Sequence, residues 1–84
     1  MQKVLIYTTK TCPFCRMERE YLDSKGVGYE EIFVDHNMKK AREMIELSGQ
    51  MGVPFTVIEK ENGETVEILG FDKQKIDETL GLKP

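Results

Sequence analysis

Four short runs of apolar and β-branched residues predict four strands. Val4 to Tyr7 is a continuous apolar run without alternation, which is typical of a central strand covered on both faces. Tyr29 to Val34 is rich in β-branched and aromatic residues and predicts a second strand. Phe55 to Ile58 and Thr65 to Leu69 predict the third and the fourth. Between them, Asn62-Gly63 favours a two-residue hairpin turn in which both central residues have positive φ.

Three further segments carry apolar residues at helical spacing. Each is bounded by a residue type that begins a helix and by a glycine that ends one. The expected ends are Pro13 and Gly26 for the first helix, Asp35 or Asn37 and Gly49 for the second, and Asp72 and Gly81 for the third. The expected apolar stripes are Phe14, Met17, Tyr21 and Leu22, then Met38, Ala41, Ile45 and Ser48 with Met44 beside them, then Ile76 and Leu80.

The resulting order is β-α-β-α-β-β-α. The first two strands are joined through a helix and should be parallel with a right-handed crossover, whereas the last two form an antiparallel hairpin. We therefore expect an α/β fold with a mixed four-stranded sheet and three helices that cover both of its faces. With 84 residues, the chain is expected to form a single domain over residues 1–84.

Composition and charge narrow the class of protein. The net charge of −3 argues against a nucleic-acid partner, because phosphate binding needs a basic face. No apolar run approaches the roughly 20 residues that span a bilayer. The apolar stretch at the N-terminus is too short for a signal peptide and lacks a small-residue cleavage site. We expect a cytoplasmic monomer without a membrane partner.

The candidate chemistry lies in Cys12 and Cys15, which follow the first strand. If Pro13 is the first helical residue, Cys12 is the N-cap and Cys15 is the third helical residue, so both lie on one face within disulfide reach. At the cap, unpaired backbone N–H groups and the helix dipole favour the thiolate of Cys12, and Lys10 and Arg16 would add to this effect. Cys12 is therefore predicted to attack a substrate disulfide, and Cys15 to resolve the mixed disulfide.

Other interpretations of these sulfur-containing residues are less favoured. A zinc site would need a second pair of Cys or His, and only His36 is left, so no metal site is predicted. Two cysteines that simply pack in the core are the remaining structural alternative. The methionines could suggest a soft-metal site, but at helical spacing they are expected to fill the core. These methionines are Met17, Met38, Met44 and Met51.

Three motifs make the chain similar to the glutaredoxin family of the thioredoxin fold. They are Cys12-Pro13-Phe14-Cys15 after a strand, Gly52-Val53-Pro54 before a strand, and Gly70-Phe71-Asp72 before the last helix. The resemblance implies that Pro54 is a cis-proline beside the cysteines and that the Val53 backbone can pair with an extended substrate. It also implies a substrate or glutathione groove formed by Lys10, Pro13, Phe14, Val53, Pro54, Gly70, Phe71 and Asp72.

The same resemblance leaves the electron donor open. Glutathione-dependent members usually carry a Lys three residues before the first Cys, where this chain has Thr9, and a Gly-Gly-x-Asp-Asp motif, of which Gly70 and Asp72 remain. The last motif also resembles NrdH-type redoxins, which take electrons from thioredoxin reductase and serve ribonucleotide reductase. We expect disulfide-containing proteins or glutathione mixed disulfides as substrates, no bound cofactor, and glutathione as a co-substrate or thioredoxin reductase as the donor. A glutathione-dependent iron–sulfur carrier is a third alternative.

Overall fold

A computed structural model describes residues 2–82, whose elements follow the predicted order. A short 3₁₀-helix, Val34–His36, follows the second strand. Within the described residues, no helix is both long and apolar enough to cross a bilayer. The strands are β1 (Lys3–Thr8), β2 (Glu30–Phe33), β3 (Phe55–Glu59) and β4 (Thr65–Leu69), and the α-helices are α1 (Pro13–Ser24), α2 (Met38–Ser48) and α3 (Lys73–Leu80).

The four strands form one mixed sheet in the order β2-β1-β3-β4. β1 pairs with β2 in parallel and with β3 in antiparallel, and β3 and β4 form the antiparallel hairpin. Leu5 lies opposite Glu30 on one side and Val57 on the other, so β1 is a central strand as its apolar run predicts. The predicted α/β class and mixed four-stranded sheet are confirmed.

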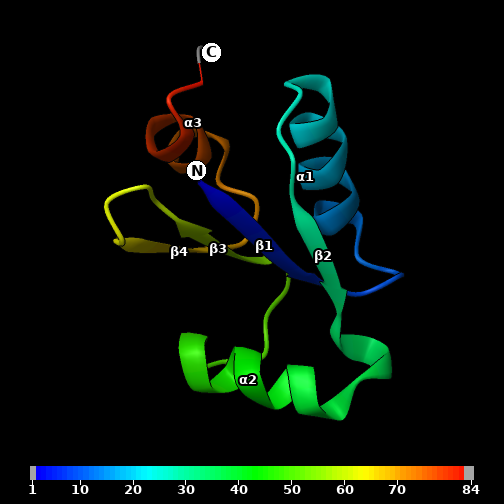
Figure 1. Ribbon diagram of the computed structural model, residues 1–84. Coiled ribbons are helices and arrows are strands. Elements are labelled where there is room, and N and C mark those ends of the chain that lie inside the picture. Colours follow the sequence, from blue (N-terminus) through cyan, green and yellow to red (C-terminus); the bar gives the residue numbers. More distant parts are fainter. Residues whose placement is uncertain (1, 83–84) are drawn as a thin grey trace.

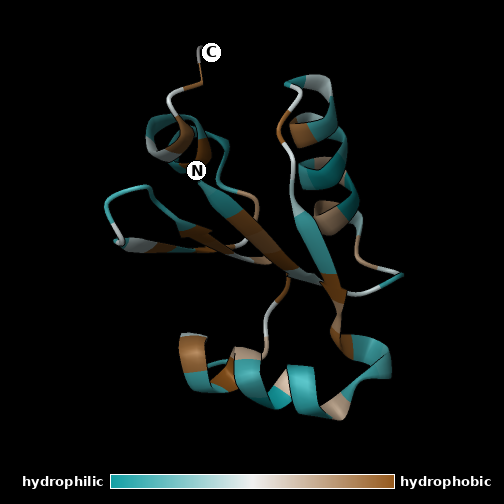
Figure 2. Cartoon of the chain, in the orientation of Figure 1, coloured by the Kyte–Doolittle hydropathy of each residue, from teal (hydrophilic) through white to brown (hydrophobic). Residues whose placement is uncertain are grey.

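Helices cover both faces of the sheet, and each face has its own apolar cluster. α1 and α3 lie on one face and α2 lies on the other (Figure 1). Figure 2 shows apolar residues along the middle of β1, whereas hydrophilic and apolar residues alternate along α2. The larger cluster consists of Val4, Ile6, Leu22, Ile58, Ile68 and Ile76, and the cluster under α2 consists of Tyr7, Met44 and Phe55.

The expected apolar stripe of α1 is wrong in its first half. Cys15, Glu18 and Leu22 are the buried residues of this helix, whereas the Phe14 side chain is 59% exposed and Met17 is 48% exposed. The buried face is therefore displaced by one residue, about 100° around the helix. The Glu18 carboxylate accepts a hydrogen bond from Thr56 on β3, so the face of α1 that carries Cys15 and Glu18 packs against the sheet.

The methionines were predicted to fill the core, and this is correct only for Met44. Met44 is 2% exposed and packs with Tyr7 and Phe55, whereas Met38 and Met51 are mostly exposed. Met38 is the first residue of α2, where the helix has only begun to cover the sheet. The helical spacing alone did not show that Met44 is buried and that Met38 is exposed.

The β3–β4 hairpin is confirmed, but its turn differs from the predicted one. Gly63 has φ +90°, whereas none of the described residues other than glycine has positive φ, so Asn62 does not adopt the left-handed conformation. Lys60 N donates to Glu64 O at 2.8 Å and Gly63 N donates to Lys60 O at 3.0 Å. The Asn62 side chain instead accepts from Glu64 N at 3.0 Å. This is a three-residue loop with glycine at the left-handed position.

Candidate active site

Cys12 lies at the N-cap of α1, at the carboxyl end of β1, as predicted. Its backbone is extended, with φ −86° and ψ 113°, and Pro13 follows as the first helical residue. The Cys12 Sγ accepts a hydrogen bond from Cys15 N at 3.2 Å. One of the unpaired N–H groups at the start of the helix is therefore aimed at the sulfur. Cys12 is partly exposed.

Cys15 lies one turn along the helix in a different environment. It is completely buried, and both cysteines are free thiols. Burial raises the pKa of the Cys15 thiol to about 12, with smaller contributions in the same direction from its hydrogen bond to Cys12 and from Glu18. At neutral pH, Cys15 is therefore a protonated thiol that solvent does not reach.

The loop before β3 brings Val53 and Pro54 to the cysteines. The Val53–Pro54 peptide bond is cis, which confirms what the resemblance implied. The Cys12 thiol donates to the Val53 carbonyl at 3.8 Å, although 41 residues separate them in the sequence. Gly70 N donates to Pro54 O at 2.8 Å, so the turn that follows β4 is held against the same loop.

The remaining residues of the expected groove have different surroundings. Phe14 is largely exposed next to Cys12 and is free to contact a ligand. Phe71 packs against the core, and its ring centroid lies 6.0 Å from that of Tyr21 on α1. Asp72 is exposed at the N-cap of α3, where its Oδ1 accepts from Lys75 N at 3.1 Å. Asp72 is available to a ligand while it caps the helix.

Lys10 lines a hollow beside Cys12. This hollow of about 460 Å³ includes Lys10, Cys12 and Pro13, but it does not include Val53, Pro54, Gly70, Phe71 or Asp72. The Lys10 backbone N–H donates to Asp35 Oδ2 at 3.2 Å. Of the expected groove residues, Lys10 and Pro13 therefore line this hollow. The other residues that line the hollow are Thr11, Arg16, Met17, Arg19 and Glu20.

One titratable residue near the cysteines was missed by the sequence reasoning. Glu18 lies on α1, three residues after Cys15, and is completely buried. Its Oε2 accepts a hydrogen bond from the Thr56 hydroxyl at 2.5 Å. Burial raises the pKa of Glu18 to about 7, although the Thr56 hydrogen bond acts in the opposite direction. The sequence carried one signal of this burial. Glu18 lies three residues after Cys15 and four before Leu22, so all three residues share one face of the helix.

Comparisons with known proteins agree with this geometry. The Glutaredoxin family model matches residues 4–62, which contain both cysteines and the cis-proline. The chain belongs to the glutaredoxin family. As a glutaredoxin, it is a redox protein with a Cys12–Cys15 pair and, in general terms, a thiol–disulfide oxidoreductase.

Individual relatives of this glutaredoxin cover most of its length. Glutaredoxin 3 of Escherichia coli is 42% identical over 74% of the chain and 75% of its own length. A glutaredoxin-like 8.6 kDa protein from the rubredoxin operon of Clostridium pasteurianum is 40% identical over 92% of the chain and 96% of its own length. The crystal structure of Methanosarcina acetivorans methanoredoxin superimposes with a TM-score of 0.80 at 27% identity, covering 94% of the chain and 84% of that protein.

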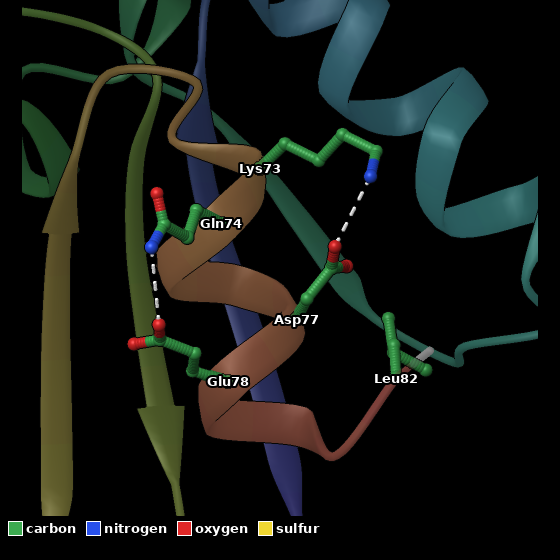
Figure 3. Close-up of a pocket in the computed structure, with 5 residues that line it drawn as sticks. All are labelled: Lys73, Gln74, Asp77, Glu78 and Leu82. Carbon is green, nitrogen blue, oxygen red and sulfur yellow. Dashed lines mark hydrogen bonds and ion pairs between the residues drawn. The ribbon is translucent and has the colours of Figure 1, made fainter. Parts of the chain in front are cut away.

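A second hollow of this glutaredoxin lies away from the cysteines. It measures about 490 Å³ and follows α3, with the Lys73–Asp77 ion pair at 3.1 Å on its wall (Figure 3). Tyr21 on α1 donates a hydrogen bond to the same Asp77, which ties the two helices together. None of the predicted site residues lines this hollow. Among residues 2–82, no three His, Cys, Asp or Glu side chains are grouped so that they would hold a metal ion.

Proposed function

We propose that this glutaredoxin reduces disulfides by a dithiol mechanism in which Cys12 attacks and Cys15 resolves. The observation that supports it is the asymmetry of the pair. The Sγ of Cys12 is partly exposed and receives the Cys15 N–H, whereas the Cys15 thiol is buried with a raised pKa. The partly exposed sulfur is thus the one that a substrate can reach, and the protonated, buried Cys15 thiol is not.

The reaction consists of two thiol–disulfide exchanges. The Cys12 thiolate attacks one sulfur of the substrate disulfide, forms a mixed disulfide and releases the other substrate sulfur as a thiolate. Cys15 then attacks the Sγ of Cys12, which forms the Cys12–Cys15 disulfide and releases the second substrate thiolate. Two electrons pass from the cysteine pair to the substrate, and an external thiol donor must return two electrons, either two glutathione molecules or one dithiol protein. We place this reaction in a reducing compartment such as the cytoplasm, where thiols are kept reduced.

The ligand groove supports protein disulfides or glutathione mixed disulfides as substrates. Next to Cys12, the Val53 carbonyl and the cis peptide bond to Pro54 offer backbone groups that can pair with an extended substrate. Asp72 at the start of α3 can meet a charged group at the far end of a small ligand. These contacts favour glutathione as the co-substrate.

The second candidate donor is thioredoxin reductase, as for NrdH-type redoxins. The observation that favours it is that Lys10 and Asp72 do not line the same hollow beside Cys12. Lys10 belongs to the hollow beside Arg16 and Arg19, whereas Asp72 lies outside that hollow. The site also retains only one Gly and one Asp of the usual Gly-Gly-x-Asp-Asp motif, Gly70 and Asp72.

Two coupled assays on the oxidised protein distinguish these donors. One supplies NADPH, glutathione and glutathione reductase, and the other supplies NADPH and thioredoxin reductase. We expect the glutathione system to restore the dithiol more efficiently, measured as NADPH oxidation that depends on the protein. Faster turnover with thioredoxin reductase would identify the NrdH-type function instead. If neither system reduces the Cys12–Cys15 disulfide, the proposed function is wrong.

A further inference from the structure

The mechanism above leaves one buried group without a role. The Glu18 carboxyl is completely buried, and its Oε1 has no hydrogen-bond partner among the described residues. Its other oxygen is bound by the Thr56 hydroxyl from β3. Burying a polar atom without a partner is costly, and most buried carboxylates are paired with a charge or fully hydrogen-bonded. An acceptor atom left open inside the protein is therefore able to receive a proton from a neighbouring group.

The neighbouring group that must lose a proton is Cys15. It lies three residues before Glu18 on the same face of α1, where side chains are adjacent. The two interact electrostatically, because a charge on Glu18 raises the pKa of the Cys15 thiol. Cys15 must become a thiolate to attack, yet it is 0% exposed, so solvent is poorly placed to take its proton.

We propose that Glu18 is the proton acceptor for the Cys15 thiol during resolution of the mixed disulfide. This inference rests on the proposed dithiol function. As Cys15 Sγ attacks Cys12 Sγ, its proton passes to the Glu18 carboxylate, the Cys15–Cys12 bond forms and the bond from Cys12 to the substrate sulfur breaks. The substrate leaves as a thiolate, and Glu18 carries the proton until the pair is reduced or the proton reaches solvent.

The surroundings of Glu18 suit this role at neutral pH. Burial and the Thr56 hydrogen bond are the influences on its pKa, and no charged side chain of the described elements contributes to it. The Thr56 hydroxyl from β3 binds its Oε2, and its charge acts on the Cys15 thiol of the same helix. With a pKa of about 7, Glu18 is an acceptor above that pH and a protonated acid below it.

The experiment separates the two thiol steps with 5,5′-dithiobis(2-nitrobenzoate) in a stopped-flow spectrometer. Attack by Cys12 on this disulfide releases one thionitrobenzoate anion, and resolution by Cys15 releases a second. In the wild-type protein, we expect the rate of the second phase to rise with pH and to level off above about pH 7. In Glu18→Gln, we expect the first phase to be unchanged and the second to be slower by at least about tenfold at pH 7. The remaining second phase should rise continuously with pH.

Glu46→Gln, an exposed glutamate on α2, is the matched control and should leave both phases unchanged. Equal second phases in Glu18→Gln and the wild type would overturn the inference but not the dithiol function. Release of only one thionitrobenzoate by the wild type would overturn both. If Glu18→Gln does not fold, Thr56→Val serves instead, because loss of its hydrogen bond should move the levelling-off to higher pH. A ¹³C-carboxyl titration of the wild type that placed the Glu18 pKa below about 5 would also contradict the inference.

Discussion

At the scale of residues, one turn of α1 gives two identical side chains opposite properties. Cys12 is at the cap, where Cys15 N donates to its sulfur, and Cys15 is inside, where burial raises its pKa to about 12. This asymmetry could be predicted because Pro13 fixes where the helix begins. The burial of Glu18 could not be predicted in the same way. A glutamate is almost always at the surface, and only the packing of α1 against Thr56 shows otherwise.

The cysteine roles are tested by two serine variants. We expect Cys12→Ser to abolish disulfide exchange, because the remaining thiol is buried and protonated. Cys15→Ser should still attack, but it should accumulate mixed disulfides with protein substrates. The measurement is mass spectrometry of the protein after mixing with an oxidised substrate protein, with and without dithiothreitol. Mixed disulfides in Cys12→Ser and none in Cys15→Ser would reverse the assignment.

Glu18 is also expected to make stability depend on pH. Its folded-state pKa of about 7 lies above the ordinary value of 4.5, so the folded protein keeps a proton that the unfolded chain has lost. Its favourable contribution is therefore complete below about pH 4.5 and is lost as pH rises to about 7. At about 1.4 kcal/mol per pKa unit, this loss is on the order of 3 kcal/mol.

Urea unfolding of the wild type, Glu18→Gln and Glu46→Gln between pH 4.5 and 8 measures this effect. We expect the free energy of unfolding of Glu18→Gln to fall less across this range than that of the other two proteins. Comparison with Glu46→Gln removes the contributions of the remaining carboxyl groups. Parallel curves for all three proteins would show that Glu18 titrates near its ordinary pKa.

At the scale of elements, the strands were predicted well because their apolar runs are also the pairing segments. β4 has the predicted bounds. β1 extends one residue beyond its predicted bounds at each end, and β3 extends one residue further at its carboxyl end. The errors occur where a side chain forms a hydrogen bond that replaces the expected turn conformation or the expected helix cap. Asn62 caps Glu64 N instead of adopting positive φ. Of the two expected caps of α2, Asn37 accepts Lys40 N, whereas Asp35 accepts the Lys10 N–H from another loop.

Asp72 combines a capping role with a candidate ligand role, and two substitutions separate them. Asp72→Ala removes the hydrogen bond to Lys75 N and should lower the free energy of unfolding by about 1 kcal/mol. Asp72→Asn keeps a good cap and should preserve stability, because Asn and Asp are similar N-cap residues. If Asp72 binds glutathione, both variants should raise the KM for glutathione in the coupled assay.

The matched control is Asn37→Ala, which removes the cap of α2 by the loss of its hydrogen bond from Lys40 N. It should cost a similar free energy, about 1 kcal/mol, without changing the KM for glutathione. A KM that is unaltered in both Asp72 variants would assign Asp72 to the helix cap alone. In that case, the argument for thioredoxin reductase as the donor becomes stronger.

At the scale of the whole molecule, the site forms where distant segments meet. The antiparallel pairing of β1 and β3 places the residues before Phe55 beside the residues after Thr8, and this brings Val53 to Cys12. The sequence alone did not contain this contact. The motif resemblance implied it, and the hydrogen bond from the Cys12 thiol to the Val53 carbonyl confirms it. The resemblance also grouped Lys10 with Asp72, but of the two only Lys10 lines the hollow beside Cys12.

This arrangement also bears on whether the protein carries an iron–sulfur cluster. A bridging cluster would use Cys12 from two chains together with glutathione. The Sγ of Cys12 is instead hydrogen-bonded to Cys15 N, and the thiol of Cys15 lies one turn away and competes by closing a disulfide. We expect the wild-type protein to be colourless and monomeric after anaerobic purification, measured by visible absorption and gel filtration. Cys15→Ser, which lacks the competing thiol, is the comparison variant. A coloured dimer of the wild type that contains iron and glutathione would contradict the dithiol function and favour the cluster carrier.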